Sequence, residues 1–195
     1  MKLKNICLII IDLETSGLNS NTNAILEIAL INIKYNEKEE AYPNKILHLN
    51  INPFKGSKIN KTSLKCNKIN IFQKLRFAIS ENEASISILE FIKNTIIENK
   101  VSKCILIGHN CWFDLMFLNN LIERTKKTNN YYHKFNVIDA STLGYITYKQ
   151  SILSNIAKNI GIKFNNKKNH SAIYDAKITT LIFCHIINKI KKTYN

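Results

Sequence analysis

"IIIDLETSG", residues 9–17, carries two acidic residues out of the end of an apolar run. The preceding residues, from Cys7 to Ile11, are all apolar and predict a buried strand. Because residues i and i+2 of a strand point to the same face, Asp12 and Glu14 share one face. Two like charges in such a place are costly unless a cation lies between them, so this strand end is a candidate cation site.

The length and composition around this stretch predict one globular domain over residues 1–195. The apolar fraction is 45%, and no apolar run approaches the ~20 residues that a membrane-spanning helix needs. The chain begins with Lys residues and turns apolar, as a signal peptide does, but the apolar part runs into Asp12 and Glu14 without a small-residue cleavage site. We therefore expect a first core strand, a cytoplasmic protein and no membrane partner.

The formal charge of +14 favours a polyanionic partner such as nucleic acid. Arg occurs only at Arg76 and Arg124, however, and the excess of Lys, Asn and Ile is what an A+T-rich genome produces. The charge is therefore discounted as evidence for such a partner. Five cysteines occur without any CxxC pair, which favours reduced thiols over disulfides or a zinc site.

Hydrophobic patterning predicts an antiparallel meander followed by alternating helices and strands, that is, an α/β domain with a mixed sheet. Trp112, beside Phe113, is expected in the core. After the first strand, further strands are predicted at 24–35, 44–52, 103–110 and 136–141. Helices are predicted at 82–100, 112–125, from 141 through 148, at 152–162 and at about 171–191, with a short helix inside 57–72.

Acidic residues stand at the edges of three of these elements. Asp12 and Glu14 end the first strand, Asp114 lies in the first turn of a helix, and His170 precedes the last helix, which carries Asp175. Two divalent cations held by such carboxylates can activate water and stabilise the leaving oxygen of a phosphodiester. Magnesium prefers these hard oxygen ligands, and manganese would accept the same ones. A histidine that titrates near neutrality suits a general base.

Each piece also has a plainer explanation. The D-x-E pair could form a turn at a strand end, and Asp114 and Asp175 could simply complement helix dipoles. His170, after two lysines, could be an exposed loop residue. The order of the pieces, each at the end of a predicted element, is what favours a joint site.

Together, D-x-E in the first strand, N-x-x-F-D at 110–114 and H-x4-D at 170–175 resemble the three motifs of the DEDDh exonuclease superfamily. That resemblance implies a ribonuclease H-like fold, with a mixed five-stranded sheet flanked by helices, and 3′→5′ hydrolysis of nucleic acid with two metal ions. It also implies that Asp12, Glu14, Asp114 and Asp175 bind the metal and that His170 is the catalytic base.

Within that superfamily the chain resembles the ribonuclease T family, over nearly its whole length and in the right order. The similar segments are IDLETSGLN, AILEIALI, INPFKG, IGHNCWFDLMF and the stretch from His170 to Lys192. The resemblance implies a homodimer in which a basic patch of one subunit holds RNA for the active site of the other. It further implies trimming of short 3′ overhangs on structured RNA, notably tRNA and ribosomal RNA precursors.

Members of the ribonuclease T family wedge terminal bases between phenylalanines at four positions. Phe113 and Phe135 match two of them, and stacking on such rings is worth ~1–3 kcal/mol per base. The other two positions hold Leu18, which can still offer an apolar contact, and Cys66. Thr62 replaces an acid that helps to discriminate the terminal base, so the preference for that base is left open.

Two other functions stay open at this point. One is a DNA proofreading-type 3′→5′ exonuclease acting on single-stranded DNA, and the other is an RNA-binding module without catalysis. The lysines that would hold RNA are also undecided. The candidates are Lys126–Lys127, Lys167–Lys168, Lys189 with Lys191 and Lys192, and the group Lys58, Lys61, Lys65 and Lys68.

Overall fold

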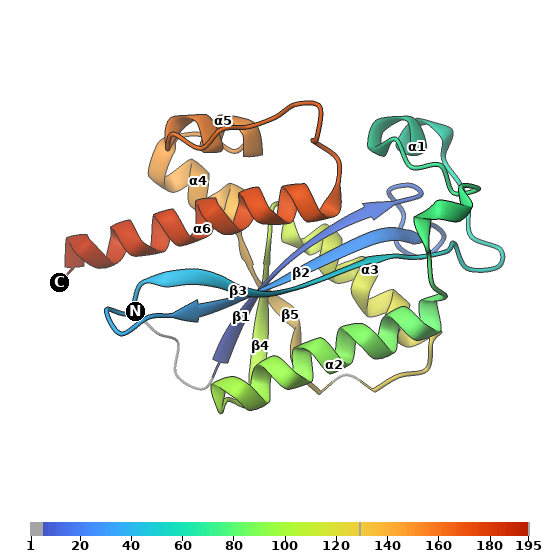
Figure 1. Ribbon diagram of the computed structural model, residues 1–195, viewed down its shortest axis with the longest axis horizontal. Coiled ribbons are helices and arrows are strands. Elements are labelled where there is room, and N and C mark those ends of the chain that lie inside the picture. Colours follow the sequence, from blue (N-terminus) through green and yellow to red (C-terminus); the bar gives the residue numbers. More distant parts are fainter. Residues whose placement is uncertain (1–5, 129, 195) are drawn as a thin grey trace.

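The computed structural model describes residues 6–128 and 130–194. A five-stranded sheet in the order β3-β2-β1-β4-β5 forms its centre (Figure 1). β1 pairs antiparallel with β2, and β2 with β3, whereas β4 and β5 run parallel to β1. This mixed sheet confirms the predicted α/β fold. The strands are β1 Ile6–Thr15, β2 Ile25–Tyr35, β3 Ala41–Asn50, β4 Lys103–Gly108 and β5 Tyr132–Asp139.

Helices cover both faces of this sheet. α6 packs on one face, with α4 and α5 against its outer side, and α2 and α3 pack on the opposite face (Figure 1). The helices are α1 Lys61–Asn67, α2 Glu81–Asn99, α3 Cys111–Arg124, α4 Ala140–Tyr148, α5 Leu153–Asn159 and α6 Ala172–Tyr194, with a 3₁₀ turn at Lys74–Arg76. None of the described helices is both long enough and apolar enough to span a membrane.

The central strand β1 is a continuous apolar run because both of its faces are covered. Ile9 and Ile11 pack toward α2 and α3, while Leu8 and Ile10 pack toward α6. A strand with both faces covered needs apolar residues at every position, not at alternate ones. The acids appear only where the strand passes beyond this core.

Element boundaries differ from the predicted ones mainly at the two outer strands. β3 begins at Ala41, three residues before the predicted start at 44, and it includes Pro43. Because β3 is an edge strand, the missing N–H of proline is tolerated there. β5 begins at Tyr132, not at 136, because the buried Tyr132 pairs with Cys104 despite the polar residues that follow it.

The parallel arrangement fixes the position of the site. β1, β4 and β5 run in the same direction, so the residues that follow their apolar segments meet at one edge of the sheet. β1 ends in the D-x-E pair, β4 ends at Gly108 before His109, and β5 ends at Asp139. α3 begins at the same edge, directly after β4.

Candidate active site

The end of β1 supplies the first two acids. Asp12 pairs with Ala29 of β2 in the antiparallel register, and Glu14 pairs with Glu27. Both acids are partly exposed, whereas the residues between and before them are buried. The strand therefore presents two carboxylates to one side of the sheet edge, as the spacing predicted.

Asp114 is the third acid and lies in the first turn of α3, where it is only 4% exposed. The start of α3 is held by Asp139, whose Oδ1 accepts hydrogen bonds from the backbone N–H of Asn110 at 2.7 Å and of Cys111 at 3.3 Å. Asp139 also caps α4 through Oδ2, which accepts from Thr142 N at 2.9 Å. Sequence reasoning missed Asp139, although its place at the end of a strand parallel to β1 was a usable signal.

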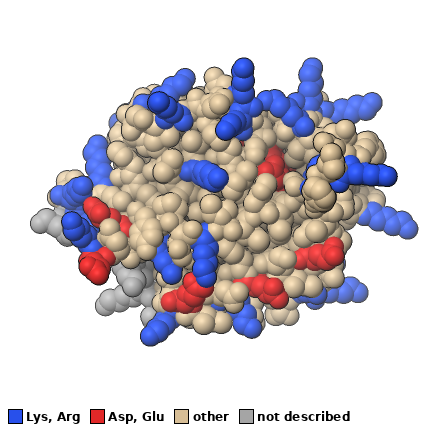
Figure 2. Space-filling model, viewed as in Figure 1, with Lys and Arg blue, Asp and Glu red and all other residues tan. Residues whose placement is uncertain are grey.

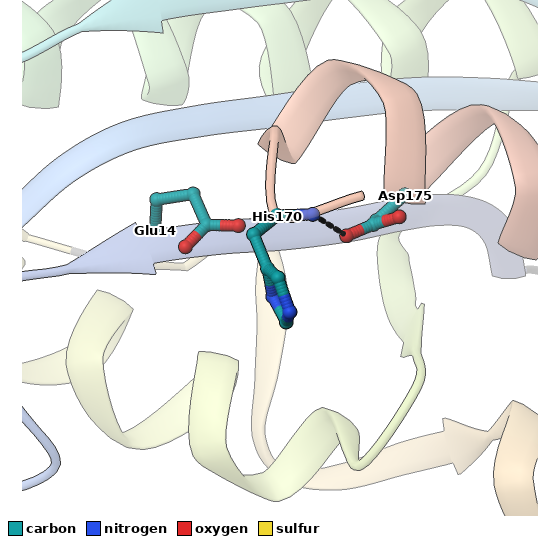
Figure 3. A group of neighbouring side chains, drawn as sticks. All are labelled: Glu14, His170 and Asp175. Carbon is teal, nitrogen blue, oxygen red and sulfur yellow. Dashed lines mark hydrogen bonds between the residues drawn. The ribbon is translucent and has the colours of Figure 1, made fainter. Parts of the chain in front are cut away.

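His170 and Asp175 come from the start of α6. The backbone N–H of His170 donates to Asp175 Oδ2 at 3.0 Å, and this bond ties the histidine to the acid five residues later. Donor atoms of Glu14, His170 and Asp175 all lie within 4.8 Å of one another, as their grouping beside β1 in Figure 3 illustrates. His170 has φ of +63°, a left-handed conformation that few residues other than glycine, Asn, Asp and His adopt readily.

Glu27 of β2 fixes the start of α6 against the sheet. Its Oε1 lies 2.6 Å from His48 Nε2 and accepts from Ser171 Oγ at 3.3 Å. Burial by itself would raise the pKa of Glu27, but His48 and the backbone N–H groups of Ala172 and Ile173 lower it. Nothing in the sequence indicated this role, because Glu27 reads as an ordinary interior position of a strand.

The acids at the site raise one another's pKa values. Burial raises the pKa of Asp12 well above its usual range, and the charges of Asp114, Asp175 and Glu14 raise it further. Burial also raises the pKa of Asp114, Asp175 and Glu14, that of Glu14 to about 8.

This donor set fits divalent cations. No Lys or Arg within the described ranges forms an ion pair with any of these four acids. Asp175 Oδ1 is moreover buried without a hydrogen-bond partner. Carboxylates that repel one another and keep an unused oxygen are the hard ligands that magnesium and related ions prefer.

A pocket of about 330 Å³ opens onto these groups. Asp12, Glu14, Asp175 and His170 line it on the acidic side. Its other walls are His109, Asn169, Ser154 and the apolar side chains of Leu13, Ile152, Leu153 and Phe164. We name it the acidic pocket. Sequence reasoning assigned no role to His109, whose partly buried imidazole follows β4 and has a pKa lowered by burial.

The predicted substrate contacts lie outside the lining of the acidic pocket. Leu18 is 82% exposed and Phe135 is 77% exposed, whereas Phe113 is partly buried, with its ring centroid 4.8 Å from that of Phe117. Cys66, at one of the departing positions, is exposed on α1. The prediction that Trp112 is in the core was wrong: it is 54% exposed, because Cys111, Asp114 and Leu115 form the inward face of α3 there.

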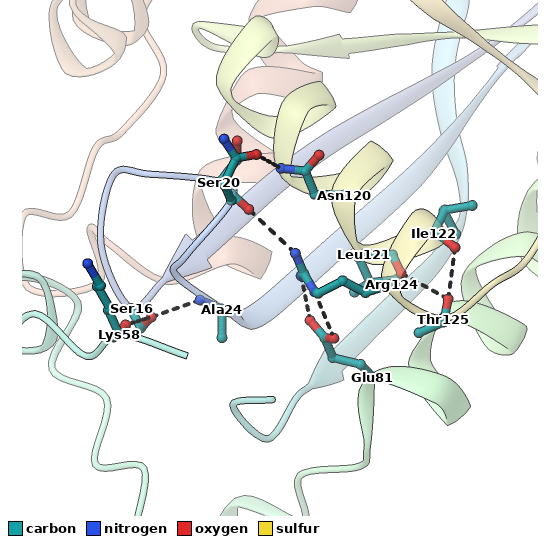
Figure 4. Close-up of polar contacts among 11 residues, drawn as sticks. Ser16, Ser20, Ala24, Lys58, Glu81, Asn120, Leu121, Ile122, Arg124 and Thr125 are labelled. Atoms are coloured by element: carbon teal, nitrogen blue, oxygen red, sulfur yellow. Dashed lines mark hydrogen bonds and ion pairs between the residues drawn. The ribbon is translucent and has the colours of Figure 1, made fainter. Parts of the chain in front are cut away.

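Arg124 holds the loop that carries Leu18 (Figure 4). Its guanidinium donates to Ser20 O at 3.4 Å and binds Glu81 through two hydrogen bonds, at 2.7 and 3.1 Å. It also lies 4.2 Å from the centroid of the Phe54 ring. Since Arg124 ends the helix that begins beside Asp114, one rigid helix positions both the acid and the loop after β1.

Comparison with known proteins places this chain in a family. Residues 9–183 match the model of the RNase_T family, which is described as "Exonuclease". Ribonuclease T of Buchnera aphidicola subsp. Baizongia pistaciae is 43% identical over 94% of this chain and 84% of its own length. Ribonuclease T of Histophilus somni is 38% identical over 94% of this chain and 84% of its own length. Ribonuclease T of Vibrio parahaemolyticus is 36% identical over 94% of this chain and 86% of its own length.

Solved structures share the fold at low sequence identity. The nuclease domain of 3′hExo, a DEDDh family member bound to rAMP, matches with a TM-score of 0.74 at 15% identity, covering 97% of this chain and 95% of that one. E. coli exonuclease I in complex with a dT13 oligonucleotide matches with a TM-score of 0.73 at 13% identity, covering 97% of this chain and 42% of that one. The chain belongs to the ribonuclease T family of exonucleases and is a 3′→5′ exoribonuclease.

Proposed function

We propose that this single-domain enzyme trims the 3′ ends of structured RNA, notably tRNA and ribosomal RNA precursors, by magnesium-dependent hydrolysis of phosphodiester bonds. The observation that supports this most directly is the convergence of three carboxylates and one histidine, from β1 and the start of α6, at the acidic pocket. Asp114 of α3 is close enough for its charge to raise the pKa of Asp12. A cytoplasmic location, where such RNAs are processed, is part of the proposal.

In this proposal Asp12, Glu14, Asp114 and Asp175 hold two magnesium ions, for which manganese can substitute. Bound there, the ions would lower the pKa of water and neutralise the charge that develops on the phosphodiester. His170 accepts the proton of the attacking water. Asp175 orients His170 by accepting a hydrogen bond from the backbone N–H of His170. Glu27 holds the start of α6 in place, and Asp139 holds the start of α3.

Exposed apolar side chains supply the substrate contacts. Leu18 and Phe135 stand free to meet bases, and Phe113 offers a ring that is already braced by Phe117. The relatives' name and the charge of +14 both support an RNA partner, and a homodimer in which a partner subunit adds further basic residues is part of the same proposal.

Two competing functions predict different results. A proofreading-type exonuclease would prefer single-stranded DNA, which is what E. coli exonuclease I holds in its complex. A binding module without catalysis would retain RNA but shorten nothing. The unpartnered Asp175 Oδ1 and the mutual elevation of the carboxylate pKa values argue against a site that has lost its metal.

The test uses a labelled tRNA-like stem with a 3′ overhang and a single-stranded DNA of matching sequence. Wild type with magnesium is expected to shorten the RNA stepwise and to stop near the duplex. His170→Asn is expected to lose activity by at least about 100-fold, the usual size of a general base effect. Asp12→Asn is expected to lose at least as much, because it removes the charge of a proposed metal ligand. Asn at position 170 keeps the left-handed backbone accessible, so the loss reports chemistry and not strain.

His185→Asn is the matched control, because His185 is exposed on α6 far from the acidic pocket. Retention of RNA without shortening, with either magnesium or manganese, would leave only the binding module. Faster shortening of the DNA would instead favour the proofreading-type exonuclease.

A further inference from the structure

A second cavity, of about 340 Å³, adjoins the acidic pocket. It shares Asn169 and His170 with that pocket, so the two cavities have a common wall. Its charge is opposite: no Asp or Glu is among the side chains that line it, whereas four lysines are. We name this cavity the lysine cleft after those residues, Lys68, Lys167, Lys168 and Lys177.

Two segments that are far apart in the sequence form the lysine cleft. Lys68 follows α1 in a left-handed conformation, and its Nζ donates to Lys167 O at 3.3 Å. The loop before α6 is itself anchored, since Asn165 N donates to the hydroxyl of Tyr174 at 2.6 Å and Lys167 N donates to Asn165 Oδ1 at 2.9 Å. The lysines are therefore presented by an ordered turn and not by a loose tail.

The cleft is connected to the catalytic acids through Asn67. This residue is only 7% exposed, and its side chain donates to Thr15 O, at the end of β1, at 3.1 Å. The same side chain contacts Glu14 and lowers the pKa of that carboxyl, which burial raises more strongly. A group bound in the lysine cleft would thus lie next to the end of β1.

Charge in this region is uncompensated. Within the described ranges none of the four cleft lysines forms an ion pair with a carboxylate. On the face shown in Figure 2, basic side chains crowd the edge that carries α1, α4 and α5, while acidic side chains gather mainly near α2 and the β2–β3 hairpin. Four ammonium groups around one cavity repel one another, so an anion would stabilise them.

We propose that the lysine cleft binds a backbone phosphate of the same RNA strand whose 3′ end lies in the acidic pocket, upstream of the bond that is cleaved. This inference rests on the proposed function. Lysine offers point charge without the forked donor geometry of arginine, which suits a phosphate and carries no base preference. The cleft acts on the active site of its own chain, whether or not a partner subunit adds further contacts.

The test compares two double variants that remove the same charge. Lys167→Gln/Lys168→Gln alters the lysine cleft. Lys93→Gln/Lys100→Gln alters exposed lysines in and just after α2, which packs on the face of the sheet opposite α6. The substrates are an RNA with a labelled 3′ overhang and a dinucleotide, whose only phosphate is the one that is cleaved.

The cleft variant is expected to raise KM for the RNA roughly three- to tenfold, as loss of exposed ion pairs does. The salt dependence of log KM should also become shallower, by ~0.7 for each phosphate that the variant no longer neutralises. KM for the dinucleotide should be unchanged, and the α2 control should match wild type on both substrates.

An unchanged KM for the RNA would overturn the inference. An equal rise with the dinucleotide would do the same, because it would place the cleaved phosphate or the product in the cleft. Binding of the RNA in EDTA, followed by fluorescence anisotropy, keeps this test separate from the proposed function. Suppose that wild type cleaves neither substrate, and that only the cleft variant binds the RNA more weakly than wild type. The proposed reaction then fails, and the phosphate site stands.

Discussion

Glu14 and Glu27 lie directly opposite each other on antiparallel strands, and their pKa values shift in opposite directions. Burial, together with the charge of Glu27, raises the pKa of Glu14 to about 8. Burial acts on Glu27 as well, but His48 and the first N–H groups of α6 more than offset it. One carboxylate is thus committed to holding a helix start, and the other is left for a cation.

Replacing Glu27 by Gln should weaken the start of α6, because Gln keeps the shape but loses the charge that the helix N-terminus favours. We expect the free energy of unfolding to fall by about 1 kcal/mol. Trimming activity should fall as well, because the same turn carries His170 and Asp175. Urea denaturation and an RNA trimming assay measure both effects. Glu90→Gln, on the exposed face of α2, is the matched control, and a Glu27→Gln enzyme indistinguishable from it would contradict this role.

Without metal, the enzyme should lose stability as pH rises from about 5 to about 8. The folded-state pKa of Glu14 is raised, so the native state holds a proton that the unfolded chain releases, and this contribution is lost as pH passes through about 8. The slope is at most ~1.4 kcal/mol per pH unit for each such group. Urea unfolding in EDTA across this range measures it.

Two further measurements test the origin of that slope. Glu14→Gln should make it shallower, and magnesium should flatten it, because a cation replaces the proton. A slope that is the same in EDTA and in magnesium would show that these carboxylates do not share a cation.

Arg124→Lys should disturb the loop after β1 although it preserves the charge. Lysine cannot donate two hydrogen bonds to Glu81 and also reach Ser20 O, so we expect a loss of about 1–2 kcal/mol in stability. KM for RNA should rise, because this loop carries Leu18. The comparison variant is Glu123→Gln, which is exposed at the same end of α3. If Arg124→Lys changed stability but not KM, the loop would not contribute to substrate binding.

Restoring an aromatic ring at position 18 should strengthen binding of the RNA 3′ end. Leu18 is exposed, so Leu18→Phe should leave stability unchanged while stacking adds ~1–3 kcal/mol per base. We expect KM for the RNA to fall at least roughly fivefold, the equivalent of ~1 kcal/mol. Phe135→Ala, at a position equally exposed to solvent, should raise KM without changing the melting temperature.

Phe113→Ala is the informative contrast, because its ring packs on Phe117 and it should reduce both binding and stability. An unaltered KM in both alanine variants would remove these residues from the substrate site.

The sequence by itself determined the order of elements and predicted which acids lie at one edge of the sheet. An apolar run can form the central strand only when both faces are covered, and D-x-E at its end places two like charges where a cation is favoured. The starts of α3 and α6 could also be predicted, because each helix begins directly after a polar turn. Local pattern and spacing carry this information because they act between residues that are close along the chain.

Tertiary structure alone decided how these pieces are held together. Glu27 and Asp139 read as ordinary strand residues, yet each anchors a helix start that lies far away in the sequence. The choice among the lysines was also invisible, because a uniform excess of Lys has no pattern along the chain. Only folding brings Lys68 beside Lys167 and separates both from the end of α6, since contacts between distant segments depend on topology and not on neighbouring residues.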